Sequence, residues 1–123
     1  MLLNQRFLPD PRVEQQYDVL KEAGYRVIVV ADTIGADSDK YEIIRVNPND
    51  GLSMNYNTTL RFNPKLSKEI IEALRNKEIS KIDAIHVHDL FWSFLGIQLR
   101  KYFGAKLIID MHENYPAFIK DCG

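Results

Sequence analysis

Apolar residues along this chain follow two alternating patterns, one typical of buried strands and one typical of amphipathic helices. Apolar or β-branched runs predict five strands, at residues 1–5, 25–31, 41–46, 84–88 and 106–111. Apolar residues at helical spacing predict helices after Asp10, Asn63 and Asp89, and a further helix begins at Pro116. Strands that alternate with helices predict an α/β fold, Rossmann-like and doubly wound, with a mainly parallel sheet and helices on both faces.

Capping residues set the bounds of these helices. Asp10 is a good N-cap and Pro11 a good first helical residue, and Gly24 is expected to end the first helix. Asp89 is expected to cap the helix that ends at Gly104. The strand at residues 41–46 is more polar than the others, which favours a place nearer the sheet edge, and its direction stays open.

Composition narrows the class of protein. The 123 residues are 46% hydrophobic and 27% charged with a net charge of −1, values of one ordinary globular domain over residues 1–123 with no bias toward nucleic acid. Cys122 is the only cysteine, which excludes a disulfide framework and favours a reducing, cytoplasmic location. No apolar stretch reaches the roughly 20 residues that span a bilayer.

Two short polar motifs each end an apolar run, His86-Val87-His88-Asp89 and Asp110-Met111-His112-Glu113. One amphipathic helix separates them, so both are expected at the same edge of a parallel sheet, where open α/β sheets bind ligands. Side chains two residues apart on a strand share a face, so His86 and His88 are expected side by side. All 3 histidines of the chain lie in these motifs, and the sequence therefore predicts a site here.

Each side chain also has a purely structural interpretation. His86 fits a core histidine better than a ligand, Asp89 is explained by helix capping alone, and His88 is open between the two interpretations. His112 is the sharpest candidate, because an imidazole there can hydrogen-bond a ligand hydroxyl or stabilise developing charge. Glu113 can bind substrate, orient His112 or cap the following helix.

A third candidate region is the start of the first helix. Its N–H groups and dipole favour an anion, and Arg12 can add a bidentate contact to phosphate. The structural alternative is that Asp10 only caps the helix and that Arg12 is a solvated side chain.

Four segments in the same order resemble glycosyltransferase family 4. Residues 6–14 and 20–27 are similar to its opening, with a D-x-R-V element that starts the first helix and an L-x-x-x-G-h-x-V element that enters the second strand. Residues 83–89 resemble its D-h-h-H-x-H-D strand end, and residues 110–116 its D-x-H-E-x-Y/F-P segment. Phe7-Leu8-Pro9 stands where the family frequently has a glycine pair.

This resemblance implies a two-domain GT-B type enzyme, of which the chain is the N-terminal, acceptor-binding half and a fragment that is inactive alone. The implied reaction moves a hexose from a nucleotide-diphosphate sugar to a saccharide or lipid-linked acceptor, as in polysaccharide biosynthesis, without a metal or other cofactor. The donor is expected to bind mainly to the C-terminal half. A lipid-linked acceptor implies peripheral contact with the inner face of the membrane.

The resemblance also implies roles for individual residues. His112 is expected to contact the transferred sugar near the reaction centre. Asp10 and Arg12 are expected to border the donor phosphates and the acceptor. His88 and Asp89 are expected to line the acceptor pocket, and Glu113 is a further substrate-binding candidate.

Two other functions stay open. A non-catalytic Rossmann-like binding module, or a subunit of a split transferase, predicts a tight complex with a partner. A metal-dependent hydrolase that uses His86, His88 and His112 with Asp89 or Asp110 predicts a stoichiometric metal ion.

Overall fold

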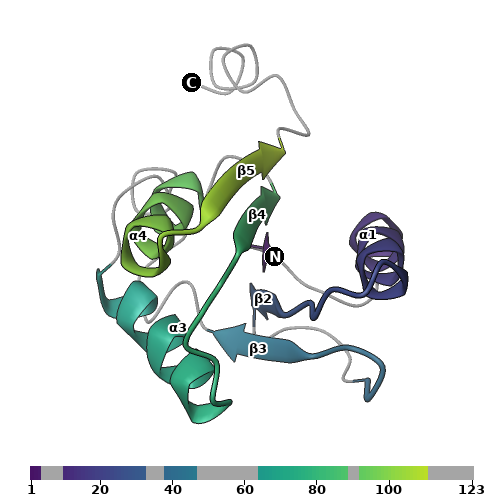
Figure 1. Ribbon diagram of the computed structural model, residues 1–123, viewed down its shortest axis with the longest axis horizontal. Coiled ribbons are helices and arrows are strands. Elements are labelled where there is room, and N and C mark those ends of the chain that lie inside the picture. Colours follow the sequence, from purple (N-terminus) through teal and green to yellow (C-terminus); the bar gives the residue numbers. More distant parts are fainter. Residues whose placement is uncertain (4–9, 33–37, 47–63, 89–91, 111–123) are drawn as a thin grey trace.

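The computed structural model describes residues 1–3, 10–32, 38–46, 64–88 and 92–110 (Figure 1). In chain order, the elements in these ranges are β1 (Leu2–Leu3), α1 (Pro11–Glu22), β2 (Val29–Asp32), β3 (Ile43–Val46), α3 (Pro64–Asn76), β4 (Ala84–His88), α4 (Ser93–Phe103) and β5 (Lys106–Asp110). The predicted helix at Pro116 lies outside the described residues.

The five strands form one sheet in the order β3-β2-β1-β4-β5, and every neighbouring pair is parallel. The predicted α/β, doubly wound fold is therefore confirmed. β3 is parallel to β2 and lies at one edge of the described sheet, as its polar pattern predicted. At the centre, β1 pairs with β2 on one side and with β4 on the other.

Helices cover both faces of the sheet, with α1 on one side and α3 and α4 on the other (Figure 1). Val13 and Tyr17 of α1 pack on Val29 and Ala31 of β2. A larger core lies beneath α3 and α4, and its buried members include Ile70, Val87, Trp92, Leu95 and Leu99. Residues 29–31 are all buried, so β2 is covered on both faces, whereas Tyr25 at the start of the predicted run is 62% exposed.

The start of α1 follows the predicted capping. The Asp10 carboxylate accepts a hydrogen bond from the Val13 N–H at 3.4 Å, and the Glu14 carboxylate accepts one from the Asp10 N–H at 3.0 Å. These two bonds use donors that a helix start otherwise leaves open. At the other end, Gly24 has a φ of 95°, a left-handed conformation that glycine adopts without strain.

The next helix begins later than a cap at Asp89 predicts, and Asp89 itself lies outside the described residues. α4 begins at Ser93, its N-cap is Trp92, and the Gly96 N–H donates to the Trp92 carbonyl at 2.9 Å. Trp92 is 3% exposed and belongs to the core under α4. A buried indole therefore stands at the described start of this helix.

The second strand is shorter than the apolar run that predicted it. β2 begins at Val29, whereas residues 25–28 have no strand conformation. β1 and β3, its neighbours, begin only at Leu2 and Ile43, so the earlier residues have no described strand beside them. The start of β2 is therefore set by where its neighbouring strands begin, and not by the apolar side chains of residues 25–28.

Candidate functional site

His88 is the last residue of β4 and lies at the carboxyl edge of the sheet. It is in register with Leu3 of β1 on one side and with Asp110 of β5 on the other. Only 1% of its surface is exposed. His88, one of the predicted site residues, therefore lies between the carboxyl ends of β1 and β5.

His86 and His88 share a face of β4, as their spacing predicted. Their rings are stacked, with centroids 4.3 Å apart and an angle of 22° between the ring planes. Ile85 and Val87 belong to the core under α3 and α4, and side chains alternate along a strand. The two imidazoles therefore lie on the sheet face that carries α1.

Asp110 adds a carboxylate to this pair. Its Oδ2 lies 3.8 Å from His86 Nε2, and the two side chains are 38% and 23% exposed. The contact is an ion pair whenever His86 is protonated. The three side chains offer ligand atoms that lie within 4.8 Å of one another. We refer to His86, His88 and Asp110 as the histidine–aspartate cluster.

Asp110 was recognised in the sequence only as part of a motif and as a ligand in the hydrolase alternative. Its pairing with His86 depends on the β4–β5 register, in which His86 lies beside Ile108 and His88 beside Asp110. One feature of the sequence could have predicted this contact. Each polar motif follows an apolar run of similar length, so the polar ends of two paired strands, β4 and β5, come to lie side by side.

Of the other predicted site residues, two lie at the start of α1 and three lie outside the described residues. Asp10 lies at the start of α1, and Arg12 is exposed in its first turn. Asp89, His112 and Glu113 lie outside the described residues. The predicted neighbourhood of His88 and His112 therefore stays a prediction.

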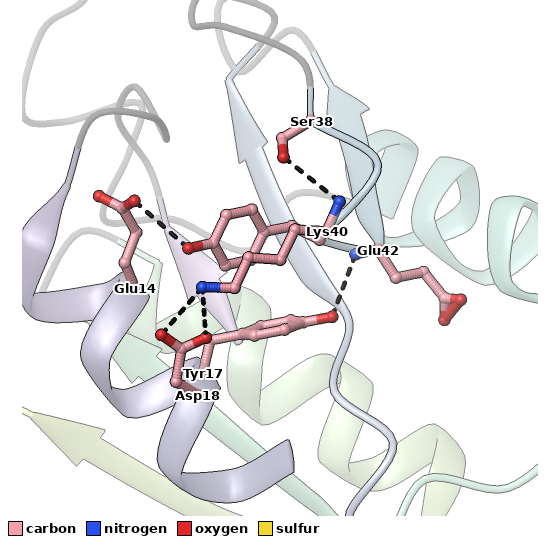
Figure 2. A network of polar contacts seen from close by, with 7 residues as sticks. Glu14, Tyr17, Asp18, Ser38, Lys40 and Glu42 are labelled. Atoms are coloured by element: carbon pink, nitrogen blue, oxygen red, sulfur yellow. Dashed lines mark hydrogen bonds and ion pairs between the residues drawn. The ribbon is translucent and has the colours of Figure 1, made fainter. Parts of the chain in front are cut away.

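A polar network fixes the segment that leads into β3 against α1 (Figure 2). The Lys40 ammonium lies 3.0 Å from the Asp18 carboxylate, and the Tyr41 hydroxyl donates to Glu14 at 3.3 Å. The buried Tyr17 hydroxyl accepts the Glu42 N–H at 3.2 Å. Hydrogen bonding and the charge of Asp18 raise the pKa of Lys40.

An open groove runs along α1 next to this network. Its lining includes Glu14, Asp18, Val19, Lys40 and Tyr41. The polar groups on its floor pair with one another, as Glu14 does with Tyr41 and Asp18 with Lys40. These pairs hold residues 38–42 on α1, and no member of the histidine–aspartate cluster lines the groove.

No helix in the described part of the chain is long and apolar enough to cross a bilayer.

Comparison with known proteins gives one match. A family model described as Glycosyltransferase Family 4 matches residues 12–121, which is most of the chain. No curated protein and no solved structure matches.

Proposed function

The chain belongs to glycosyltransferase family 4, and we propose that it is the acceptor-binding, N-terminal part of a GT-B type enzyme. The proposed reaction transfers a hexose from a nucleotide-diphosphate sugar to a saccharide or lipid-linked acceptor. The observation that carries the proposal is the family match over residues 12–121 on a parallel, doubly wound sheet. Open sheets of this kind bind ligands beyond the carboxyl ends of their strands.

The proposed phosphate contact falls on Arg12. Pro11 has no N–H, the Val13 N–H donates to the Asp10 side chain, and the Glu14 N–H donates to the Asp10 carbonyl at 2.9 Å. The N–H groups of Val13 and Glu14 thus donate to Asp10 itself. Arg12 is exposed in this first turn, and its guanidinium can take two phosphate oxygens at once. Asp10 then acts by holding this turn in place.

We propose that the acceptor is contacted by the last residue of β4 and by residues that follow β4 and β5 in the sequence. His88 is buried between β1 and β5, and its proposed role is to shape the wall of the acceptor pocket. Asp89 and Glu113 follow the two strand ends in sequence and are proposed as further acceptor contacts. His112 is proposed to contact the transferred sugar and to stabilise the charge that develops as the diphosphate leaves.

This division of labour requires no metal ion. The leaving diphosphate would be stabilised by cationic side chains such as Arg12 and by groups of the C-terminal half. The 123 residues alone are then expected to bind an acceptor without turning over a donor. The proposed setting is the cytoplasmic side of a membrane when the acceptor is lipid-linked.

The test uses the chain joined to the segment that follows it in the intact protein, with nucleotide-diphosphate hexoses as donors and released nucleotide diphosphate as the signal. His112→Ala should abolish transfer. Arg12→Gln should raise the donor KM, with a smaller effect on the acceptor KM.

Arg100→Gln is the matched control, because Arg100 is an exposed arginine in the last turn of α4, near the amino end of the sheet. Donor turnover by the 123 residues alone would contradict the proposal, as would full activity of the His112 variant.

A further inference from the structure

We propose that the histidine–aspartate cluster of His86, His88 and Asp110 binds one divalent transition-metal ion of the zinc class. This site goes beyond the glycosyl transfer proposed above, which uses no metal. Its role would be to tie β5 to β4 at the end of the sheet (Figure 1).

The backbone brings the three ligands together without any long-range loop. His86 and His88 are two residues apart on β4, and Asp110 is in register with His88 on the neighbouring strand. Their ligand atoms lie within 4.8 Å of one another. Because two paired strands carry all three ligands, the site is positioned as soon as β4 and β5 pair.

The type of ligand selects the type of ion. Two imidazoles and one carboxylate suit zinc, cobalt, nickel or iron(II), whereas calcium and magnesium prefer sites made of oxygen ligands. Three protein ligands also leave a coordination position for water. The part-exposed side chains of His86 and Asp110 provide the route by which an ion enters.

Coordination requires a small rearrangement. Ligand atoms around a tetrahedral zinc are separated by about 3.3 Å, as its bond lengths of roughly 2.0–2.1 Å imply. The observed rings are stacked at 22°, so their lone pairs do not yet point at a common atom. Rotation of the part-exposed His86 ring about its Cβ–Cγ bond closes the cluster, while the buried His88 ring stays in place.

Binding should be measurable on the 123-residue chain after removal of metal with a chelator. Titration with Co²⁺, followed by its visible absorption, and with Zn²⁺, followed by calorimetry, should give one ion per chain. Zn²⁺ should also raise the melting temperature, because an ion that binds only the folded state stabilises it.

Asp110→Asn and His86→Gln should each weaken binding by more than about tenfold, since even outer-shell changes around a metal cost about 10- to 100-fold. Asp83→Asn is the matched control, because Asp83 precedes β4 with a side chain that is 82% exposed. Cys122→Ser should bind as the unaltered chain does. Undiminished binding by the Asp110 and His86 variants would overturn the proposal, and so would loss of binding in the Cys122 variant.

A measurement on the unaltered chain guards against variants that fail to fold. Bound Co²⁺ is paramagnetic, so the amide resonances of residues 85–88 and 108–110 should show the largest changes. Absence of saturable binding, or largest changes elsewhere in the chain, would refute the site. Glycosyl transfer does not enter these measurements, so their failure leaves the proposed function untouched.

Discussion

Gly96 of α4 lies so close to Val87 of β4 that no side chain fits between them. A Cβ at Gly96 would be 2.6 Å from Val87 Cγ2 and 3.1 Å from Leu107 Cδ1. The helix therefore lies directly on the strand that carries His86 and His88. This contact sets how closely α4 approaches the sheet.

Gly96→Ala is expected to destabilise the fold despite the higher helix propensity of alanine. Propensity favours alanine by about 1 kcal/mol, whereas overpacking of a core costs roughly 1–3 kcal/mol. We expect a net loss of about 1 kcal/mol in urea unfolding. Gly96→Ala should cost less in a Val87→Ala chain than in the original chain, because the methyl group that the new Cβ meets is then absent. A Gly96→Ala chain as stable as the original would show that α4 lies farther from β4.

Tyr17→Phe should cost more stability than Tyr41→Phe. The Tyr17 hydroxyl is buried and accepts the Glu42 N–H, so its loss leaves a backbone donor without that acceptor. The Tyr41 hydroxyl is part-exposed, and water can replace its bond to Glu14. We expect about 1 kcal/mol for Tyr17→Phe and less for Tyr41→Phe in chemical denaturation. Equal losses would count against the network in Figure 2.

The stability of a chain that begins at Met1 should fall as the pH drops from 8 to 5. The Met1 amino group donates to the Ile28 carbonyl at 2.8 Å, and burial lowers its pKa to about 5. In this window the unfolded chain binds a proton that the folded chain does not, so acid favours unfolding. A difference of about three pKa units corresponds to roughly 4 kcal/mol at most.

The control for this pH dependence is a short N-terminal extension. It converts the Met1 amine into an amide, which still donates to Ile28 but does not titrate. The extended chain should lose the part of the slope between pH 5 and 8 that comes from the amine, while the histidines contribute equally to both chains. Identical slopes would show that the amine is not buried.

Glu42 should titrate below its usual range. A two-pronged hydrogen bond from Arg26, at 3.0 and 3.1 Å, lowers the pKa of this carboxyl. The resulting stabilisation is present above the unfolded pKa of Glu42 and is lost as the pH falls through its lower folded value. Arg26→Gln should raise the pKa of Glu42, as measured by NMR, with little effect on stability because the pair is near the surface. An unchanged pKa would contradict the pairing.

The strand and helix pattern was readable because local signals agree with the fold. Ala84–His88 forms β4 over the predicted residues, and Asp10 caps α1 as predicted. Three features were not readable from local signals. The start of β2 depends on where its neighbours begin, the start of α4 depends on burial of Trp92, and the His86–Asp110 contact depends on strand register. Each is decided by residues distant in the sequence.

The candidate site, too, was predictable only where local strand geometry decides it. Same-face placement of His86 and His88 came from strand geometry alone, which is local. Assignment of His112, Arg12 and Asp89 to sugar and phosphate came from likeness to a family, and a fold by itself does not specify a reaction. Those roles are the ones that the His112 and Arg12 variants test.

The two residues of β1 have a consequence for how the molecule assembles. Leu2 joins the two halves of the sheet, because it pairs with β2 on one side and with β4 on the other. Its partner in β4, Val87, comes from far along the chain. Closing so long a loop delays folding, so β1 gains its second neighbouring strand only after residues 84–88 have been synthesised. A ribosome would have to release most of this chain before its centre could form.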